Sequence, residues 1–261
     1  MSLLRLDRLT RRFGGLTAVD AVSLEIEPGR VSAIIGPNGA GKTTLFNVIS
    51  GFLAPSEGRV DFGGRELTGR QPHEIAALGV VRTFQLVQLF PELTAVENVQ
   101  VGRHLRTHGG VWAALARPAW AKREQVETAA VARELLAFVG LGGREDVQAA
   151  ALPYGQQRLL EIARAMAAEP KLLLLDEPAA GLNPAETEHL AETIRRIVAR
   201  GITVLLIEHD MSLVMRLADR IFVLDFGRLI AAGTPAEVQR NEAVLAAYLG
   251  GVETEAEAAH A

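Results

Sequence analysis

The 261-residue chain contains no cysteine, and this absence excludes three kinds of chemistry. Without a thiol there is no disulfide, no thiolate metal site and no cysteine nucleophile. Long apolar runs are also missing, because no stretch reaches the roughly 18 residues that a membrane-spanning helix needs. The first residues, 1–7, carry charges too early for a secretory signal peptide. We therefore expect a cytoplasmic protein, which can still lie against a membrane partner.

An excess of positive charge is missing as well. The chain has 27 Lys and Arg against 31 Asp and Glu, which gives a net charge of −4. A nucleic-acid groove needs clustered basic residues, so we expect no nucleic-acid partner. With 49% hydrophobic residues, the chain has the composition of a globular protein. Its length allows one large domain or a core with a smaller lobe, and no internal repeat is present.

A glycine-rich segment is the most informative stretch. Its residues match G-x-x-x-x-G-K-[ST], a loop that surrounds nucleotide phosphates with backbone N–H groups. They are Gly36, Pro37, Asn38, Gly39, Ala40, Gly41, Lys42, Thr43 and Thr44. The flanks fit, since 31–35 predicts an apolar strand and 45–49 a helix. Lys42 would neutralise β- and γ-phosphate charge, and the Thr43 hydroxyl would bind Mg²⁺. The alternative is a glycine-rich turn with a surface lysine.

An apolar run that ends in two acidic residues is the second informative stretch. Residues 172–175 are all leucine, and Asp176 and Glu177 follow them. A buried parallel strand would bring both carboxylates to the sheet edge where the glycine-rich loop opens. Asp176 could then hold Mg²⁺, directly or through water, and Glu177 could polarise an attacking water. The plainer interpretation is a strand that runs into a polar turn.

Two further polar residues are expected at the same edge. Gln85 follows a predicted buried strand over 80–84, and His209 follows another over 202–207. In α/β folds this end of a strand carries ligand-contacting groups, although Gln85 alone is a weak signal. For His209 the position favours a contact to the γ-phosphate over a structural role.

Alternating apolar and charged residues predict two half-exposed strands, over 3–9 and 22–26, before the loop. Phe13 lies in the predicted turn between them. An aromatic ring at such a turn can offer its face to a purine, but a lone Phe13 is more typical of local core.

Strand signals vanish over 86–152, which predicts an inserted helical lobe. Thr94 to Glu97 forms a capping box that begins a helix, and a second helix over 124–139 ends at Gly140. Another helix follows Leu152 and ends near residue 168.

Charged residues follow the polar side of that last helix. Arg158, Glu161 and Arg164 have the spacing of a solvated face with an i,i+3 ion pair. Asn183 later predicts the N-cap of a further helix, which Gly201 stops.

The lobe also holds both tryptophans and a pair of histidines. Trp112 and Trp120 lie near basic residues and would form a partner or bilayer surface if exposed; packing inside the lobe is an equal alternative. His104 and His108 are four residues apart, but Leu105 stands where a metalloprotease helix has Glu. We therefore expect solvated histidines rather than a metal site.

Taken in order, these segments resemble the nucleotide-binding subunit of ABC transporters from residue 3 to about 250. The matching pieces are the glycine-rich loop, Gln85, 152–156, Asp176 with Glu177, 180–183 and His209. The resemblance implies an α/β fold: a RecA-like P-loop NTPase core with an antiparallel β subdomain and an inserted α-helical subdomain. A single domain over 1–250 would comprise a core of 1–85 and 158–250 and a helical part of 86–157, with an acidic tail over 251–261.

The resemblance also implies a head-to-tail dimer with two ATP molecules at its interface. Phe13 would stack on adenine, and Gln85 would bind Mg²⁺ and report the γ-phosphate to a membrane subunit. Gly155 and Gln156 would face the partner's nucleotide. The expected partners are ATP, transmembrane permease subunits and, indirectly, a periplasmic solute-binding protein. The chain would then lie on the inner face of the cell membrane.

Two segments depart from the family pattern, at three positions in all. The signature Leu-Ser-Gly-Gly-Gln has Pro153 and Tyr154 in place of Ser and the first Gly, and Asn183 stands where most members have Asp. Proline offers neither a hydroxyl nor an N–H. Backbone groups at Gly155 and the helix N-terminus would therefore carry more of the contact to the opposite γ-phosphate.

Within the family, four sequence segments look most like those of the ATPase of branched-chain amino acid importers: residues 11–19, 81–85, 154–158 and 179–184. Urea-type importers and lipopolysaccharide-export ATPases share much of the sequence of these segments. Whether the dimer pairs identical or related chains stays open, although the resemblance favours related ones.

Two other functions remain as alternatives. A DNA-repair or ribosome-associated ATPase of the same fold is disfavoured, because the chain has no cysteine, no heptad array and one cassette. Pro153 suggests the other, a nucleotide sensor with little turnover.

Overall fold

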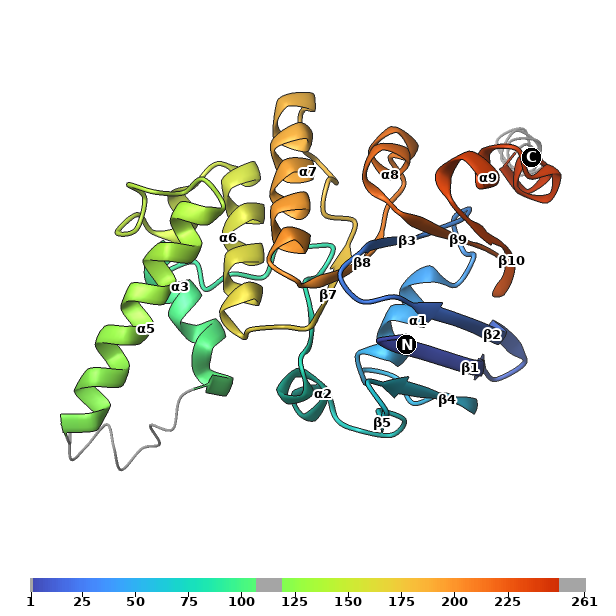
Figure 1. The fold of residues 1–261 in the computed structure, drawn as a ribbon, viewed down its shortest axis with the longest axis horizontal. Helices are drawn as coiled ribbons and strands as arrows, with labels where there is room; N and C mark the ends of the chain where they lie inside the picture. The colour runs from blue at the N-terminus through green and yellow to red at the C-terminus, as the bar shows by residue number, and fades with distance from the viewer. Residues whose placement is uncertain (1, 107–118, 249–261) are drawn as a thin grey trace.

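A computed structural model describes residues 2–106 and 119–248. Figure 1 shows two sheets on one side of the molecule and a group of helices on the other. Trp112, His108 and the acidic tail lie outside the described residues.

The larger sheet has the strand order β10-β9-β3-β8-β7-β6. All neighbours pair in parallel except β10, which is an antiparallel edge strand. The strands are β3 (Val31–Ile35), β6 (Val80–Arg82), β7 (Leu172–Asp176), β8 (Thr203–Ile207), β9 (Arg220–Asp225) and β10 (Arg228–Gly233). Every residue of β3, β7 and β8 is buried, as expected for parallel strands covered on both faces.

The smaller sheet is antiparallel and has the order β2-β1-β4-β5. Its strands are β1 (Leu4–Phe13), β2 (Leu16–Ile26), β4 (Glu57–Phe62) and β5 (Arg65–Glu66). The first two strands are longer than predicted, because cross-strand pairing extends to Phe13 and Leu16 at the tip of the hairpin.

Helices cover both faces of the larger sheet. They are α1 (Lys42–Ile49), α2 (Pro72–Leu78), α3 (Ala95–Gly102), α5 (Ala119–Phe138), α6 (Tyr154–Ala167), α7 (Pro184–Ala199), α8 (Met211–Leu217) and α9 (Pro235–Gln239), with 3₁₀ turns η1 (Arg103–Arg106) and η2 (Ala149–Ala151). Among the described residues, no helix has both the length and the apolar character to cross a membrane.

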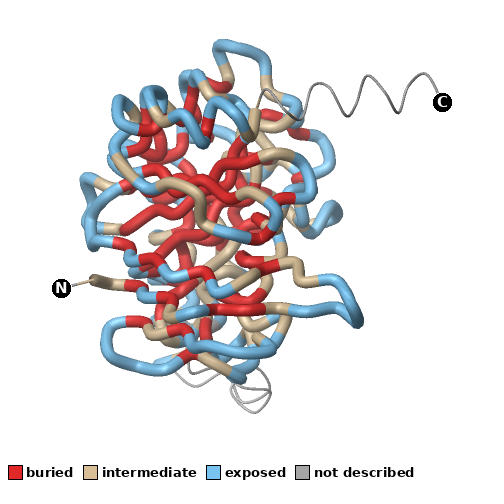
Figure 2. The backbone as a smooth tube through the Cα atoms, turned by 90° about the vertical axis from the view of Figure 1, so that its right-hand side faces the viewer, coloured by how far each residue is buried: buried red, intermediate tan, exposed pale blue. Residues whose placement is uncertain are grey.

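Two hydrophobic clusters form the core. One joins α1 and the smaller sheet to one face of the larger sheet, through residues such as Leu45, Leu172 and Leu174. The other joins the opposite face, through Leu173 and Leu175, to the remaining large helices. Alternate leucines of β7 therefore pack into opposite clusters. Figure 2 shows the buried segments running through the middle of the molecule.

Most local predictions are confirmed. The α/β class with an antiparallel sheet and a helical lobe is correct, and the capping box at Thr94 forms as expected. Helix α5 begins earlier than predicted. The side chain of Trp120 is exposed, so for this residue the interpretation as core is wrong. The predicted boundary at residue 157 falls inside α6.

Candidate functional site

The glycine-rich loop connects β3 to α1, and its shape requires glycine at two positions. Gly36 has φ 151°, and a Cβ there would lie 2.0 Å from the carbonyl oxygen of Leu224. Gly41 has φ 97°, and a Cβ there would lie 2.2 Å from the carbonyl oxygen of Ala18 on β2. A larger residue at either position would displace backbone, so the sequence forces a close turn that exposes backbone N–H groups.

Lys42 begins α1 and is nearly buried beneath this loop. Its Nζ donates to the carbonyl oxygens of Gly36 (2.7 Å) and Pro37 (2.9 Å). Burial lowers the pKa of Lys42, while Glu177 and Asp176 act to raise it. No side chain caps the first turn of α1, so its N–H groups and helix dipole suit phosphate.

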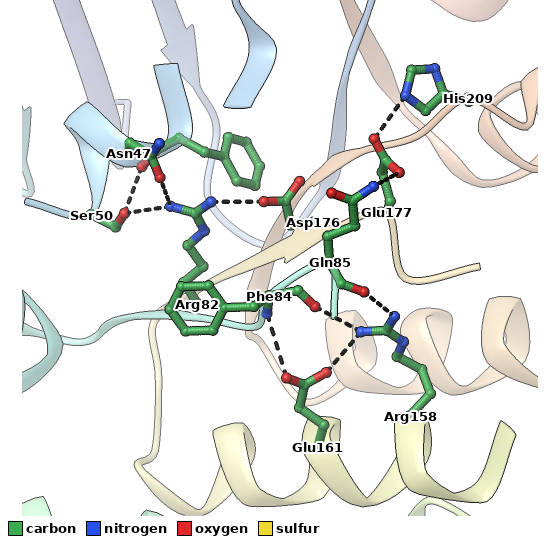
Figure 3. A network of polar contacts seen from close by, with 11 residues as sticks. Asn47, Ser50, Arg82, Phe84, Gln85, Arg158, Glu161, Asp176, Glu177 and His209 are labelled. Atoms are coloured by element: carbon green, nitrogen blue, oxygen red, sulfur yellow. Dashed lines mark hydrogen bonds and ion pairs between the residues drawn. The ribbon is translucent and has the colours of Figure 1, made fainter. Parts of the chain in front are cut away.

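Asp176 ends β7 and forms an ion pair that the sequence did not predict. Its Oδ2 lies 2.7 Å from Nη2 of Arg82, and both side chains are nearly buried. Arg82 also donates to Asn47 on α1 (2.7 Å) and to Ser50, the C-cap of α1 (3.0 Å), as Figure 3 shows. Arg82 thus orients the Asp176 carboxylate and ties β7 to α1. The available signal was a charged residue inside a predicted buried strand, which needs a partner.

Glu177 lies between the two residues predicted to share its sheet edge. Gln85 Nε2 donates to its Oε2 at 2.7 Å, and His209 Nε2 lies 2.8 Å from its Oε1. A carboxylate only accepts, so His209 Nε2 carries the donated hydrogen. The structure therefore brings Gln85, Glu177 and His209 together, each from the end of a different strand (Figure 3).

The backbone of Glu177 is strained. Its φ of 46° lies in the left-handed region, and its N–H donates to the carbonyl oxygen of Ile207 at 3.0 Å. Such a conformation costs on the order of 1–3 kcal/mol for a non-glycine residue and occurs mainly at functional sites. In this conformation the carboxylate lies between Gln85 and His209.

Glu208 is a buried residue that sequence reasoning missed. Its carboxylate accepts the N–H of Ala179 at 2.7 Å and that of His209 at 3.1 Å. It therefore joins the loop after Glu177 to the segment that carries His209. Burial raises its pKa, and backbone N–H donors oppose this. A glutamate directly after a buried strand was the only available signal.

The segment that resembles the family signature begins α6, with Pro153 as its N-cap. A Cβ on Gly155 would lie 2.4 Å from Oε1 of Glu186, so the first turn of α6 packs closely on α7. The ring of Tyr154 lies over Gly181, with Cε1 3.1 Å from a Cβ built there. Gln156 is half-buried, and its Oε1 has no hydrogen-bond partner.

This segment is separate from the glycine-rich loop of the same chain. Across the described residues, no hydrogen bond or ion pair joins 153–157 to 36–44. In Figure 1, α6 and α1 lie on opposite sides of β7.

Phe13 ends β1 at the tip of the hairpin and is 42% exposed, so its interpretation as local core is wrong. The guanidinium of Arg11 lies 4.6 Å from the centre of its ring. The hairpin passes beside the glycine-rich loop, because the Ala18 carbonyl lies against Gly41. An aromatic face is thus available near the loop.

The prediction of a solvated face on α6 is also wrong. Arg158 and Glu161 form the expected i,i+3 ion pair, with 2.9 Å between Nη1 and Oε2, but both side chains are fully buried. The irregular segment that follows β6 covers them: its carbonyl oxygens accept from Arg158, and its N–H groups face the Glu161 carboxylate (Figure 3).

The oxygen donors at the site suit magnesium bound with phosphate. Thr43, Gln85 and Asp176 offer a hydroxyl, an amide oxygen and a carboxylate, all hard ligands. The described part of the chain holds no group of three or more His, Asp or Glu able to bind a metal alone. The residues therefore fit Mg²⁺ that keeps water and phosphate oxygens as further ligands.

Comparisons with known proteins agree with this geometry. The family model described as ABC transporter matches residues 19–180, and one described as branched-chain amino acid ATP-binding cassette transporter matches 228–254. The high-affinity branched-chain amino acid transport ATP-binding proteins LivG of Salmonella typhimurium and BraF of Pseudomonas aeruginosa are each 47% identical, over 95% of this chain and 98% of their own. The probable LivG of Archaeoglobus fulgidus is 37% identical over 98% of this chain and 99% of its own.

Solved structures give the same result for the fold. A nucleotide-free ATP-binding cassette from an ABC transporter matches with a TM-score of 0.83 and 36% identity, covering 95% of this chain and 99% of its own. The ADP conformation of such a cassette matches with a TM-score of 0.84 and 36% identity, covering 96% and 99%.

Proposed function

Because this chain belongs to the ABC transporter family and is one of its RecA-like ATPase cassettes, we propose that it powers the import of branched-chain or other hydrophobic amino acids. The names of its relatives support the solute class, since they describe high-affinity branched-chain amino acid transport. The family model that matches residues 228–254 carries the same description.

The observation that carries the proposal is the carboxylate of Glu177, held on both oxygens at the sheet edge beside the glycine-rich loop. Glu177 would accept a proton from the water that attacks the γ-phosphate of ATP. Gln85 and His209 would hold the carboxylate toward that water, and the exposed His209 ring would also contact the γ-phosphate. Fixing these groups in advance lowers the entropy cost of the reaction.

The phosphates would be bound by the backbone of the glycine-rich loop and by Lys42. That loop comprises residues 36–44, and Phe13 would add an adenine contact from the neighbouring hairpin. Lys42 already lies beneath the loop, bonded to the carbonyl oxygens of Gly36 and Pro37, and its charge would stabilise the β- and γ-phosphates. Thr43, Gln85 and Asp176 would hold Mg²⁺, which neutralises phosphate charge when bound.

We further propose that two cassettes act together. The separation of residues 153–157 from the chain's own glycine-rich loop supports a role for Gly155 and Gln156 at a partner's nucleotide. The partner would be a second copy or a related ATPase. In each cassette, residues 1–250 would form one domain. Permease subunits would hold the pair of cassettes on the inner face of the membrane. A solute-binding protein would act through the permease.

Reconstitution of the transporter tests the proposal. The chain would be co-purified with its membrane subunits, placed in vesicles and supplied with solute-binding protein loaded with leucine, isoleucine, valine or urea. We expect the binding protein loaded with a branched-chain amino acid to stimulate ATP hydrolysis above the unloaded control. Stimulation by urea alone, or co-purification of ribosomes or DNA in place of membrane subunits, would overturn it.

A further inference from the structure

The ion pair of Arg158 and Glu161 lies between α6 and the irregular segment 84–88 and is fully buried. Burial raises the pKa of Glu161, while the positive charge of Arg158 acts to lower it. Burying two charges carries a desolvation cost that only good geometry and further hydrogen bonds repay, and apolar residues of similar size often give equal or higher stability. A role in stability alone therefore explains this pair poorly.

The planar guanidinium of Arg158 donates hydrogen bonds to four acceptors. Nη1 donates to the carbonyl oxygen of Phe84 at 2.8 Å and to Glu161 Oε2 at 2.9 Å. Nη2 donates to the carbonyl oxygen of Gln85 at 2.6 Å and to the hydroxyl of Tyr154 at 3.1 Å. Only a guanidinium presents donors in this arrangement. One side chain on α6 thus holds two successive carbonyl groups of the segment after β6.

Glu161 completes the attachment with its second oxygen. Its Oε1 lies 3.5 Å from the N–H of Phe84 and 3.4 Å from that of Gln88, at the outer limit of hydrogen bonding. The segment 84–88 is irregular, so no sheet ladder satisfies these backbone groups. Its position therefore depends on the two charged side chains.

Gln85 connects this attachment to the catalytic carboxylate. Its carbonyl oxygen faces Arg158, while its side-chain Nε2 reaches Glu177 Oε2 at 2.7 Å (Figure 3). A shift of the Gln85 backbone would move the amide away from Glu177. The same guanidinium bonds Tyr154, whose ring lies over Gly181 in the loop after Glu177.

We propose that Arg158 and Glu161 are positioning residues for ATP hydrolysis, which fix segment 84–88 to α6 and thereby hold the Gln85 amide on Glu177. The proposal rests on the proposed role of Glu177. It also gives Tyr154, a departure from the family signature, a function: its hydroxyl joins the start of α6 to the same guanidinium.

The first test replaces both charges by apolar residues of similar size, Arg158→Met with Glu161→Leu, in the reconstituted transporter. We expect the fold to be kept, but kcat for hydrolysis to fall by about 10²-fold, as misplacement by roughly an ångström can do. Calorimetric Kd for ATP on the isolated chain should stay within about twofold, because the glycine-rich loop is untouched.

A matched control removes an ion pair that joins two other helices. Glu134 on α5 and Arg200 at the end of α7 are paired at 3.1 Å, but both are exposed and lie outside segment 84–88. Glu134→Leu with Arg200→Met should leave kcat unchanged. Equal loss in both double variants, or wild-type kcat in the Arg158 and Glu161 variant, would overturn the proposal.

A double-mutant cycle tests whether the loss of kcat is transmitted through Gln85. If the pair acts through Gln85, adding Arg158→Met and Glu161→Leu to Gln85→Ala should lower kcat by less than about twofold further. A full, additive loss would show a different route and overturn the proposal.

Arg158→Lys covers the case in which the apolar variant does not fold. Lysine keeps the charge but loses the fork, so we expect a fall in kcat that is again absent in the Gln85→Ala background. Retained kcat would overturn the proposal. Glu177→Gln in the same assay separates the two proposals: wild-type hydrolysis there would refute the role of Glu177 itself.

Discussion

At the scale of single residues, Glu177 is the residue with the most unusual surroundings. It combines a left-handed backbone, a bond to Gln85 and a bond to His209. None of these alone indicates a base for hydrolysis. Together they hold one carboxylate in a fixed direction next to a loop built for phosphates, which is what preorganised catalysis requires.

Phe13 gives the first prediction. Phe13→Ala should weaken ATP binding by about 1–3 kcal/mol, or roughly 5- to 150-fold in Kd, if the ring stacks on adenine. The melting temperature should hardly change, because the ring is already exposed. Calorimetry on the isolated chain measures Kd, with Phe13→Tyr as a control that keeps an aromatic face. Unchanged affinity in the alanine variant would refute the stacking role.

Glu208 gives a prediction about pH. Burial raises its pKa above the ordinary value of 4.5, and the nearby Glu177 carboxylate acts in the same direction. A raised carboxyl pKa contributes stability that is fully present below the unfolded-state pKa and is lost as pH rises through the folded-state pKa. The free energy of unfolding of the wild type, relative to Glu208→Gln, should therefore fall as the pH rises from about 4.5.

Urea unfolding of both proteins at a series of pH values checks this expectation. A difference that stays constant, or that grows with pH, would contradict it.

Individual residues also show where sequence reasoning stops. The spacing of Arg158 and Glu161 identified their ion pair, but spacing reveals only which residues share a helix face. What covers that face is segment 84–88, about 70 residues earlier in the chain, and no local pattern encodes that contact. Arg82 was overlooked for the same reason, since its partner Asp176 lies on the neighbouring strand.

At the scale of elements, the sequence predicted best what is decided locally. The capping box at Thr94 and the N-cap at Asn183 form as expected, because cap and helix lie within four residues of each other. The meeting of Gln85, Glu177 and His209 at one sheet edge was also predictable, since parallel strands end on the same side of a sheet. The lengths of β1 and β2 were not, because they depend on pairing across the hairpin.

The cap of α7 gives a prediction at this scale. Asn183 accepts the N–H of Glu186 at 3.0 Å, and Glu186 returns a bond to the N–H of Asn183. Asn183→Ala should lower the free energy of unfolding by about 1 kcal/mol, and Asn183→Asp should not, because Asp caps equally well. Urea unfolding measures both variants. Equal loss in both would mean that the amide matters for something other than the cap.

At the scale of the whole molecule, the candidate site is divided between parts of the chain. The glycine-rich loop and the acids lie on the larger sheet, Phe13 on the smaller one, and the signature-like segment on the helical lobe. That last segment makes no polar contact with the loop, which favours a function across two chains.

The Glu177→Gln variant tests whether two chains form a dimer around ATP. With the base removed, ATP should bind but barely turn over, so the variant should accumulate as an ATP-bound dimer. Light scattering after size-exclusion chromatography in ATP and Mg²⁺ measures the mass, with ADP as the control that should return monomers. A mass that ignores the nucleotide, or hydrolysis at the wild-type rate, would count against the dimer and the base respectively.

The contact between Ala18 and Gly41 has one more consequence. It places the Ala18 carbonyl, on β2 of the smaller sheet, against the glycine-rich loop that follows β3 of the larger sheet. A nucleotide that contacts both Phe13 and the loop would therefore bridge the two sheets. A side chain at Gly41 would push the Ala18 carbonyl away. Such a change should therefore weaken ATP binding at the loop and at Phe13 together, although Phe13 itself is untouched.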